Sequence, residues 1–280
     1  MGGHPDTMRP ASRFLNPDQM IILAPPLTDP PANFEGFEVD RVRHMRFLGE
    51  AQRLRGRVYV QDGAIGLQQL TADGRFVQSH DEQSWQFLVM NAEGIVSGCA
   101  RFTPKNHDVV FSDFGFARSA LAHCPSWGNH LRRAVEAKRA EAKKRGLAYG
   151  ELGGWALSDE IRHSREALRI SLNVWGLMKL LGGALAITMA TRRHRSSEIL
   201  RKLGGHRLYS GGIELPSYYD SQYECEMEIL GFDSDNPNPK YEMWIQECQR
   251  KVRSLTVICS EPLCENWETP HGDFEMECVS

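Results

Sequence analysis

The sequence predicts an α/β chain, built as a mixed central sheet with helices on both faces. Residues 147–157 and 184–191 are short apolar runs typical of buried strands, and a helical pattern separates them. A strand, a crossover helix and a second strand in this order imply a parallel pair. Residues 85–90 and 94–102 are two further runs joined by a turn, which predict an antiparallel meander beside that pair.

The N-terminal half is predicted to contain an arm and two helices. Residues 1–38 mix prolines with polar residues without a period, which indicates a flexible arm. Residues 41–59 alternate cations with apolar side chains, a pattern typical of an amphipathic helix. A second helix over 130–145 is expected to begin after the cap Asn129 and to end at Gly146.

The parallel pair and its flanking elements follow. The strand over 147–157 carries three glycines, which predict a bulge where a ligand or another backbone comes close. Ser164 is the expected N-cap of the crossover helix, and the glycines at 182–183 are its expected stop. After the second strand, a short helix is expected to begin at Ser196 or Ser197.

The C-terminal part reads as an extension of the main domain. Residues 214–230 alternate acidic with aromatic and apolar residues, which predicts a late strand that closes the mouth of a pocket. Asn238 precedes Pro239 at a predicted helix start, and 255–259 reads as one more strand. We therefore divide the chain into an arm (1–38), a folded domain (39–232) and an extension with a helix and an acidic tail (233–280).

Composition restricts the class of protein. The chain has 280 residues, 41% of them hydrophobic, which is enough for a sizeable core. A net charge of -3 argues against a nucleic-acid binder. The apolar run MIILAPPL is short and broken by prolines, so we expect no membrane span, and the start lacks a secretory signal pattern. Seven cysteines without CxxC spacing indicate reduced thiols, no metal site and a cytoplasmic location.

Cations gather where the predicted crossover helix begins. Free N–H groups at a helix start, together with the positive end of the helix dipole, favour a phosphate group. Phosphopantetheine and coenzyme A both carry phosphates, so this helix start predicts a site for their thioesters. The residues concerned are Arg162, His163, Ser164 and Arg165.

The order of the elements resembles the second half of the GNAT acyltransferase fold, with SSEILRKLGG (196–205) as its small final helix. The segments QRLRGRVY (52–59), GRFVQSHDEQSWQFLVM (74–90) and GIVSGCARFTP (94–104) are similar to acyl-homoserine-lactone synthases and long-chain N-acyl amino acid synthases. The resemblance covers roughly residues 41–232. It implies a GNAT-like mixed sheet whose two parallel strands splay apart, so that an acyl thioester lies in the gap.

The resemblance also implies roles for five side chains. Arg55 and Tyr59 match an arginine and an aromatic residue on the first helix and are expected to bind substrate. Asp81 matches an acidic residue before the second strand, and Arg101 the arginine of a Gly-Cys-x-Arg strand. Glu151 matches the glutamate that opens the bulged strand, and we expect it to orient or deprotonate an amine, unless it forms an ion pair with Arg101.

The backbone of the bulged strand completes the expected site. N–H groups around Gly153, Gly154 and Trp155 are placed to hydrogen-bond a thioester oxygen as negative charge develops on it. Asp81 is expected to pair with Arg101 or Arg55 in a network that shapes the acceptor pocket. Two positions depart from the lactone synthases, which have an acidic residue at Gln78 and an arginine at Gly154. An amino acid acceptor therefore fits better than S-adenosylmethionine.

The predicted helix over 130–145 is rich in cations. Its charged face is either a solvated surface or a dock for an acidic partner. Acyl carrier proteins are acidic, and lactone synthases take acyl chains from them, so the resemblance implies a carrier-protein partner. The residues of this expected dock are Arg132, Arg133, Arg139, Lys143 and Lys144.

These expectations combine into an N-acyltransferase. It would move a medium or long acyl chain from an acyl carrier protein or coenzyme A thioester to the amine of an amino acid or similar small amine, with no tightly bound cofactor. The alternatives are an acyl-homoserine-lactone synthase that uses S-adenosylmethionine, an ordinary acetyltransferase that uses coenzyme A, and a non-catalytic regulator that binds acyl thioesters.

Overall fold

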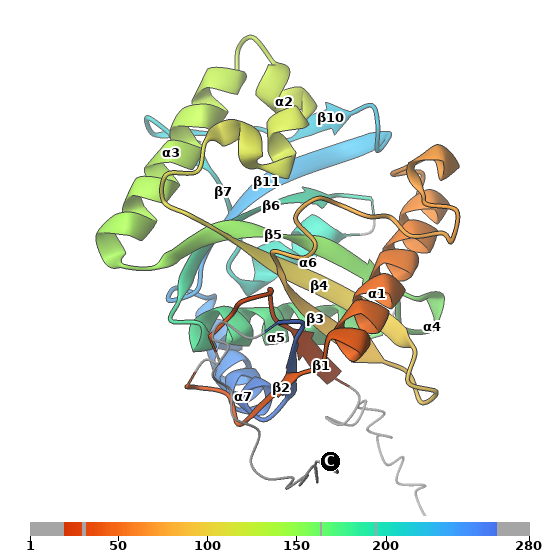
Figure 1. Cartoon of the computed structure of the whole chain (residues 1–280). Coiled ribbons are helices and arrows are strands. Elements are labelled where there is room, and N and C mark those ends of the chain that lie inside the picture. The colour runs from red at the N-terminus through yellow and green to blue at the C-terminus, as the bar shows by residue number, and fades with distance from the viewer. Residues whose placement is uncertain (1–19, 30–31, 163, 194, 262–280) are drawn as a thin grey trace, which may run out of the picture.

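The computed structural model describes residues 20–29, 32–162, 164–193 and 195–261. Within these residues a ten-stranded mixed sheet runs in the order β10-β11-β6-β5-β4-β3-β1-β12-β2, with β7 beside β11 (Figure 1). The sheet strands are β1 (Met20–Leu23), β2 (Gly36–Val39), β3 (Trp85–Met90), β4 (Val96–Lys105), β5 (Ala148–Leu157), β6 (Ala184–Thr191), β7 (His206–Arg207), β10 (Tyr218–Asp220), β11 (Cys225–Asp233) and β12 (Thr256–Cys259). A separate hairpin joins β8 (Tyr209–Ser210) to β9 (Ile213–Glu214).

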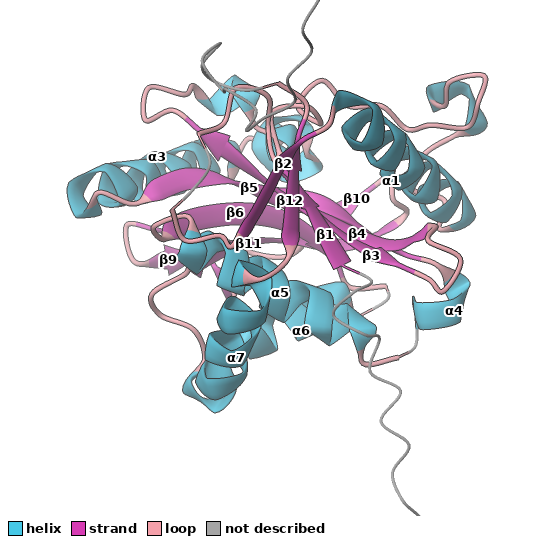
Figure 2. Cartoon of the chain, turned by 60° about the horizontal axis from the view of Figure 1, so that its bottom comes forward, coloured by secondary structure: helices cyan, strands magenta, loops and turns pink. Residues whose placement is uncertain are grey.

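Helices cover both faces of this sheet, as the sequence predicted. The helices are α1 (Arg41–Gln61), α2 (Ala120–His123), α3 (Gly128–Arg145), α4 (Asp159–Arg162), α5 (Glu166–Leu180), α6 (Ser196–Leu203) and α7 (Glu242–Arg253). Short 3-10 turns occupy η2 (Leu67–Gln69), η3 (Phe111–Asp113), η4 (Gly115–Arg118) and η5 (Pro239–Tyr241). Helices α1 and α3 lie over one face, and α5, α6 and α7 over the other (Figure 2). The expected α/β class is therefore confirmed.

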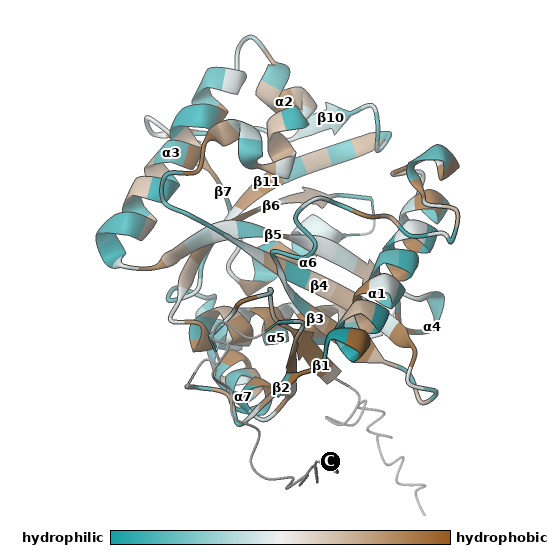
Figure 3. Ribbon diagram, in the orientation of Figure 1, coloured by the Kyte–Doolittle hydropathy of each residue, from teal (hydrophilic) through white to brown (hydrophobic). Residues whose placement is uncertain are grey.

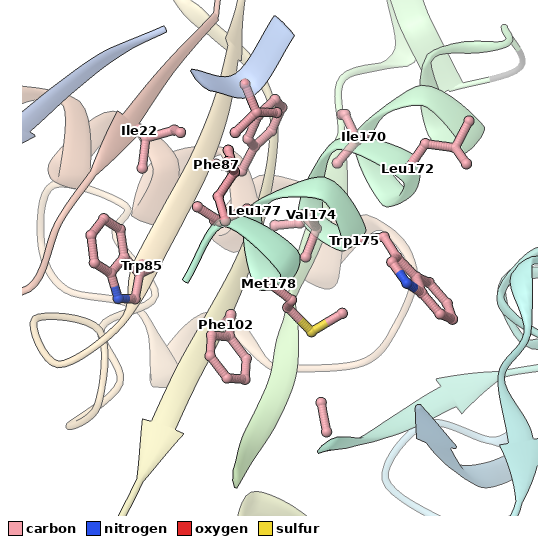
Figure 4. Packing of buried hydrophobic residues seen from close by; sticks show 14 of the residues in the cluster. Ile22, Trp85, Phe87, Phe102, Ile170, Leu172, Val174, Trp175, Leu177 and Met178 are labelled. Atoms are coloured by element: carbon pink, nitrogen blue, oxygen red, sulfur yellow. The ribbon is translucent and has the colours of Figure 1, made fainter. Parts of the chain in front are cut away.

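The core forms where these layers meet. Buried side chains of α5 pack with the inner faces of β1, β3, β6 and β12, and α7 packs on α5. Figure 4 shows the α5 part of this cluster, with Leu177 and Met178 among the residues of the neighbouring strands. Gly176 permits the close approach of α7, because a Cβ there would lie 2.9 Å from the backbone nitrogen of Gln249. Two smaller apolar clusters lie under α3 and α1.

The parallel pair β5 and β6 separates partway along its length. Pairing runs from Ala148 opposite Ala184 to Glu151 opposite Ile187, and both strands then continue without further ladder partners in each other. On its other edge β5 pairs with β4, where Gly154 and Trp155 together face the single residue Ala100. Gly154 has φ +64, a conformation that glycine adopts without steric cost. This bulge bends β5 away from β6, and the expected splay is confirmed.

Part of the expected N-terminal arm belongs to the sheet. Residues 20–23 form β1, which is buried and pairs with β3 on one side and β12 on the other. Residues 36–39 form β2, which pairs with β12. The prediction of an arm over 1–38 is therefore wrong for residues 20–23 and 36–38, because a strand of four residues is too short to show a pattern of its own and is stabilised by partners far along the chain. Residues 1–19 and 262–280, and with them the expected acidic tail, lie outside the described residues.

Two helix starts differ from the expected caps. Helix α3 begins at Gly128, one residue before the expected cap Asn129, and Trp127 precedes it without a side-chain cap. The reason is close packing, since a Cβ at Gly128 would lie 2.4 Å from the carbonyl oxygen of Ala122. Ser164 is one residue outside the N-cap of α5, although its hydroxyl accepts from the backbone of Glu166. Gly146 ends α3 as expected, with φ +67.

If β1 belongs to the core, truncating Ile22 should weaken the whole fold. Ile22 is fully buried between neighbouring strands, so Ile22→Ala is expected to lower the free energy of unfolding by about 2–4 kcal/mol in urea titration. The matched control is Val42→Ala, because Val42 is 79% exposed and its loss should leave the midpoint unchanged. Equal midpoints for both variants would show that β1 is dispensable.

Candidate functional site

A cavity of about 470 Å³ lies where β5 and β6 separate. Its lining comes from both faces of the sheet, so the gap between the strands is open from the α1 side to the α5 side. Residues of one face are polar, and residues of the other are apolar. Among them are His80, Arg101, Gly115, Arg118, Glu151 and Tyr223 on the first face, and Val174, Trp175, Met178, Leu200, Leu203 and Phe232 on the second.

A buried ion network supports the polar end of the cavity. Arg55 on α1 donates to both carboxylate oxygens of Asp81, at 2.7 and 2.6 Å, and Arg101 on β4 donates to one of them at 2.5 Å. The side chain of Gln52 and the backbone N–H of Gln78 add two bonds of 3.0 Å to the same carboxylate. The structure thus brings together three of the residues that sequence comparison singled out, with Asp81 at their centre.

This network holds two cations against one anion. The side chains of Arg55 and Asp81 are 0% and 1% exposed, and Arg101 is 7% exposed at the cavity wall. Burial opposes ionisation of Asp81, but the hydrogen bonds and charge of Arg55, with the charge of Arg101, outweigh it and lower the pKa of Asp81. Burial, and then the charge of Arg55, lower the pKa of Arg101. One excess positive charge therefore borders the cavity.

His80 contacts this network and is uncharged. Its Nε2 atom lies against a terminal nitrogen of Arg101, and an arginine only donates, so Nε2 accepts the bond. Burial, followed by the charge of Arg101, lowers the pKa of His80 to about 4. His80 therefore presents a neutral imidazole to the cavity, which its sequence context beside Asp81 did not reveal.

Glu151 is placed in the cavity by β5 and held by one backbone group. Its carboxylate accepts from the N–H of Gly115 at 3.0 Å, and within the described residues it forms no ion pair with Arg101. Burial raises the pKa of Glu151, although the bond from Gly115 and the charge of Arg101 act in the opposite direction. A carboxylate with a raised pKa is a better proton acceptor than an exposed one.

The bulge in β5 lies directly over Arg101. A Cβ on Gly154 would lie 3.1 Å from Cγ of Arg101 and would have to adopt the strained positive φ. Any other residue at this position would therefore be strained and would push the Arg101 side chain aside. Trp155 and Tyr59 line the cavity beside the bulge, and the hydroxyl of Tyr59 donates to the carbonyl of Trp155 at 3.4 Å. Gly153 lines the cavity as well.

The expected phosphate-binding residues lie in different places. Arg162 lines the cavity, where its guanidinium is paired with Asp62. Ser164 and Arg165 are exposed and are absent from the described residues that line the cavity, and His163 lies outside the described residues. The first N–H of α5 is already bonded to the Ser164 hydroxyl, so this helix start is less open than the sequence suggested.

The basic residues of α3 lie on an outer surface, seen as the teal turns of that helix in Figure 3. Arg139 donates to the carbonyl of Val109 and pairs with Glu136, and Arg132 stacks on the ring of Phe111. Of the five residues of the expected dock, Arg132, Arg133, Lys143 and Lys144 are exposed. The C-terminal turn of α3 leads into the paired start of β5, so Lys143 and Lys144 lie at the closed end of the gap.

Several cavity residues were missed by the reading of the sequence. Asp62 ends α1, and Arg193 follows β6, so the two are 131 residues apart and meet only in the fold. Thr188 on β6 donates to the carbonyl of Leu152 at 2.8 Å, across the point where the strands part. The run of cations after β6, TRRHR, was the available signal for Arg193.

Comparison with known proteins supports the fold. No family model matches the chain, and no curated protein matches it. Among solved structures it is similar to a CoA-dependent acyl-homoserine lactone synthase, BjaI, solved with SAM and isopentyl-CoA. The two are 14% identical with a TM-score of 0.52, over 85% of this chain and 92% of that one. FeeM, an N-acyl amino acid synthase from uncultured soil microbes, is 12% identical over 71% of this chain and 88% of that one, with a TM-score of 0.45. The resemblance to lactone synthases is therefore confirmed for the fold.

The charge network should be required for folding as well as for the site. Asp81→Asn leaves Arg55 and Arg101 buried without an anion, so we expect a loss of about 3–5 kcal/mol in the free energy of unfolding at pH 7. Because the pKa of Asp81 is lowered in the folded state, its contribution is present above the ordinary carboxyl pKa of about 3.9 and is lost as the pH falls below it. Urea titration at several pH values measures both effects.

The exposed pair formed by Glu35 and Arg253 supplies the control. Glu35→Gln should leave the urea midpoint unchanged at each pH. If both variants lost the same free energy of unfolding, burial of the network would add nothing to its contribution to stability.

Proposed function

We propose that the chain is an N-acyltransferase, which transfers a medium or long acyl chain from a pantetheine thioester to the amine of an amino acid or similar small amine. The observation that carries this proposal is the cavity through the parted strands β5 and β6. It joins a polar compartment with Glu151 and Arg101 to an apolar compartment with Trp175 and Phe232. A thioester with its acyl chain in the apolar part would present its carbonyl carbon to the polar part.

Glu151 is the group that would prepare the amine. Attack on a thioester needs an uncharged amine, and a free α-amino group titrates at a pKa of about 7.7–8.0. The buried carboxylate of Glu151, held by Gly115, can accept one proton from the bound ammonium group directly or through a water. The thiol product has a pKa of about 8.5 when free, so it leaves without a strong acid.

The charge network favours an acceptor that carries a carboxylate. Two arginines share one aspartate beneath the bulge, and the excess positive charge lies beside the cavity wall at Arg101. An arginine in such a place attracts a carboxylate and binds it with defined geometry. In this proposal Arg101 and Asp81 position the acceptor, while Arg55 and Tyr59 support them from α1.

The thioester itself would be held by the bulged strand. Backbone N–H groups of Gly153, Gly154 and Trp155 are our proposed donors to the thioester oxygen as it gains charge. The donor is acyl carrier protein or coenzyme A, because both present the same pantetheine arm. Of the exposed cations of α3, Arg132 and Arg133 near its start would serve a carrier protein, since Lys143 and Lys144 lie at the closed end of the gap. The free thiols of the five described cysteines support a cytoplasmic location.

A direct assay tests this proposal. Purified protein is incubated with acyl carrier protein and coenzyme A thioesters of several chain lengths and a panel of amino acids, and acyl amides are sought by mass spectrometry. The proposal fails if no amide forms above the background without protein. Release of methylthioadenosine from S-adenosylmethionine would instead identify a lactone synthase, and thioester binding without turnover a regulator.

Removing the carboxylate should separate binding from chemistry. Glu151→Gln is expected to lower kcat by about 10²–10⁴-fold, while the dissociation constant of the acyl thioester stays within about twofold. Because burial raises the pKa of Glu151, activity of the native protein should fall with decreasing pH at values above the ordinary carboxyl pKa of about 4.3. That acidic limb should be missing from the residual activity of the variant.

The control for this experiment is Glu226→Gln on β11, the strand on the far side of β6, since Glu226 is an exposed partner of Arg192. It should keep native kcat and the native pH profile. Native kcat in Glu151→Gln would exclude Glu151 as the base.

Filling the apolar end should change the choice of acyl chain. Leu200→Trp adds a large ring to the cavity wall, so kcat/KM for long-chain donors is expected to fall by about tenfold or more, with a smaller effect on short chains. Leu168→Trp is the matched change at a partly buried leucine of the same core that is not among the cavity residues. A uniform loss over all chain lengths in Leu200→Trp would argue that the acyl chain lies elsewhere.

A further inference from the structure

His80 is a cavity residue whose backbone is held in place by its neighbours. It lies in the loop between α1 and β3 and lines the polar part of the cavity. The hydroxyl of Ser84 donates to its backbone carbonyl at 2.5 Å, and the next residue, Asp81, is the buried centre of the ion network. The loop therefore presents the His80 ring to the cavity from a defined position.

The His80 ring has one nitrogen in use and one free. Nε2 accepts from Arg101, and a pKa lowered to about 4 by burial, and then by the charge of Arg101, keeps the ring neutral at pH 7. In a neutral imidazole whose Nε2 accepts, Nδ1 carries the proton. Within the part of the chain that the structure describes, Nδ1 has no hydrogen-bond partner and is not among the buried unpartnered atoms. His80 thus offers an N–H donor at the cavity wall.

Arg101 keeps donors of its own beside this ring. Two of its five N–H groups bond to Asp81 and His80, and the others have no partner among the described residues. A Cβ on Gly153 would lie 3.6 Å from Nη2 of Arg101 and 3.7 Å from its Nε, so this edge of the guanidinium lies against β5 at the cavity wall. Because a neutral imidazole cancels no charge, His80 holds Arg101 without removing the excess positive charge of the network.

These donors match a carboxylate that enters the cavity. A carboxylate has two oxygens that accept hydrogen bonds, and a guanidinium binds it with defined geometry. An acidic side chain in place of His80 would neutralise Arg101 and repel the same ligand. Because the acceptor nitrogen of His80 is already occupied by Arg101, the ring cannot take a proton from the amine. Its chemistry is that of a binding group.

We propose that His80 is a specificity-determining residue, which together with Arg101 binds the α-carboxylate of the amino acid acceptor. The N–H at Nδ1 donates to one carboxylate oxygen, and Arg101 donates to the other. In the α-carboxamide of the same amino acid an NH2 group replaces one oxygen, so one bond and the attraction between charges are lost, and the site selects the free amino acid. This inference rests on the proposed function, because it defines the acceptor class for the same cavity.

Calorimetric titration tests this without turnover. The probes are glycine, leucine, phenylalanine and glutamine, each paired with its α-carboxamide, and the ratio of the dissociation constants of carboxamide and amino acid defines a carboxylate preference. For the pair that binds most tightly, the native protein should prefer the amino acid by about tenfold or more. His80→Gln keeps an acceptor for Arg101 at the position of Nε2 but has no donor at the position of Nδ1, so it should lower the preference by about tenfold.

His80→Asn is the matched rescue. Its shorter side chain places an amide donor at the position of Nδ1, so the preference should stay within about threefold of native. His123→Gln is the control for a histidine outside the cavity, because His123 is exposed on α2 and is not among the cavity residues. The carboxamide probe monitors folding in each titration, since a misfolded variant would lose both probes, whereas loss of the donor weakens binding of the amino acid alone.

The inference is overturned if the native protein binds amino acids and carboxamides equally or binds neither, if His80→Gln keeps the native preference, or if His80→Asn loses as much of it as His80→Gln. Acylation of amino acids and carboxamides with equal kcat/KM would uphold the proposed acyl transfer and exclude this carboxylate site. A carboxylate preference in the expected order, without acyl amides in the assay above, would contradict the acyl transfer and leave the carboxylate site standing.

Discussion

The bulge at Gly154 is the constraint on which the rest of the site depends. Two residues of β5 face one residue of β4 there, and the positive φ of Gly154 lets the chain make the extra step. The strand bends toward β4, and its pairing with β6 stops at Glu151. A sheet that stayed paired would close the cavity, because neighbouring strands lie only about 4.7–4.9 Å apart.

The same bulge explains the unusual charge arrangement beneath it. With no side chain at 154, the aliphatic part of Arg101 lies against the backbone of β5, and its guanidinium reaches Asp81. A buried ion network is a poor source of stability, since desolvation offsets much of the attraction. The network does hold Arg101 in one position at the cavity wall, whereas an exposed arginine side chain would be flexible. We interpret the network as an adaptation for binding, because well-packed apolar side chains in place of the whole network would stabilise the fold as well or better.

The two ends of the gap are chemically different, and this gives the site a direction. The end near the start of β5 and β6 is closed by regular pairing and by the α5 core, with apolar side chains. The other end is bordered by α1, the loop after β6 and the turn between β10 and β11, which Arg193 ties together. A long molecule with an apolar tail and an anionic head fits this polarity.

Sequence by itself determined the local elements and the main chemistry-bearing residues. Periodicity and glycines located α1, β3, β5, α5 and β6 to within a few residues, because helices and buried strands are encoded by neighbouring side chains. Motif resemblance selected Arg55, Asp81, Arg101 and Glu151, and the first three meet in one hydrogen-bonded network. Only the tertiary structure decided that 20–23 is a core strand, since its partner lies at 256–258. Likewise, only the fold brought Asp62 to Arg162 and Arg193, because ion pairs between distant segments leave no periodic signal in either segment.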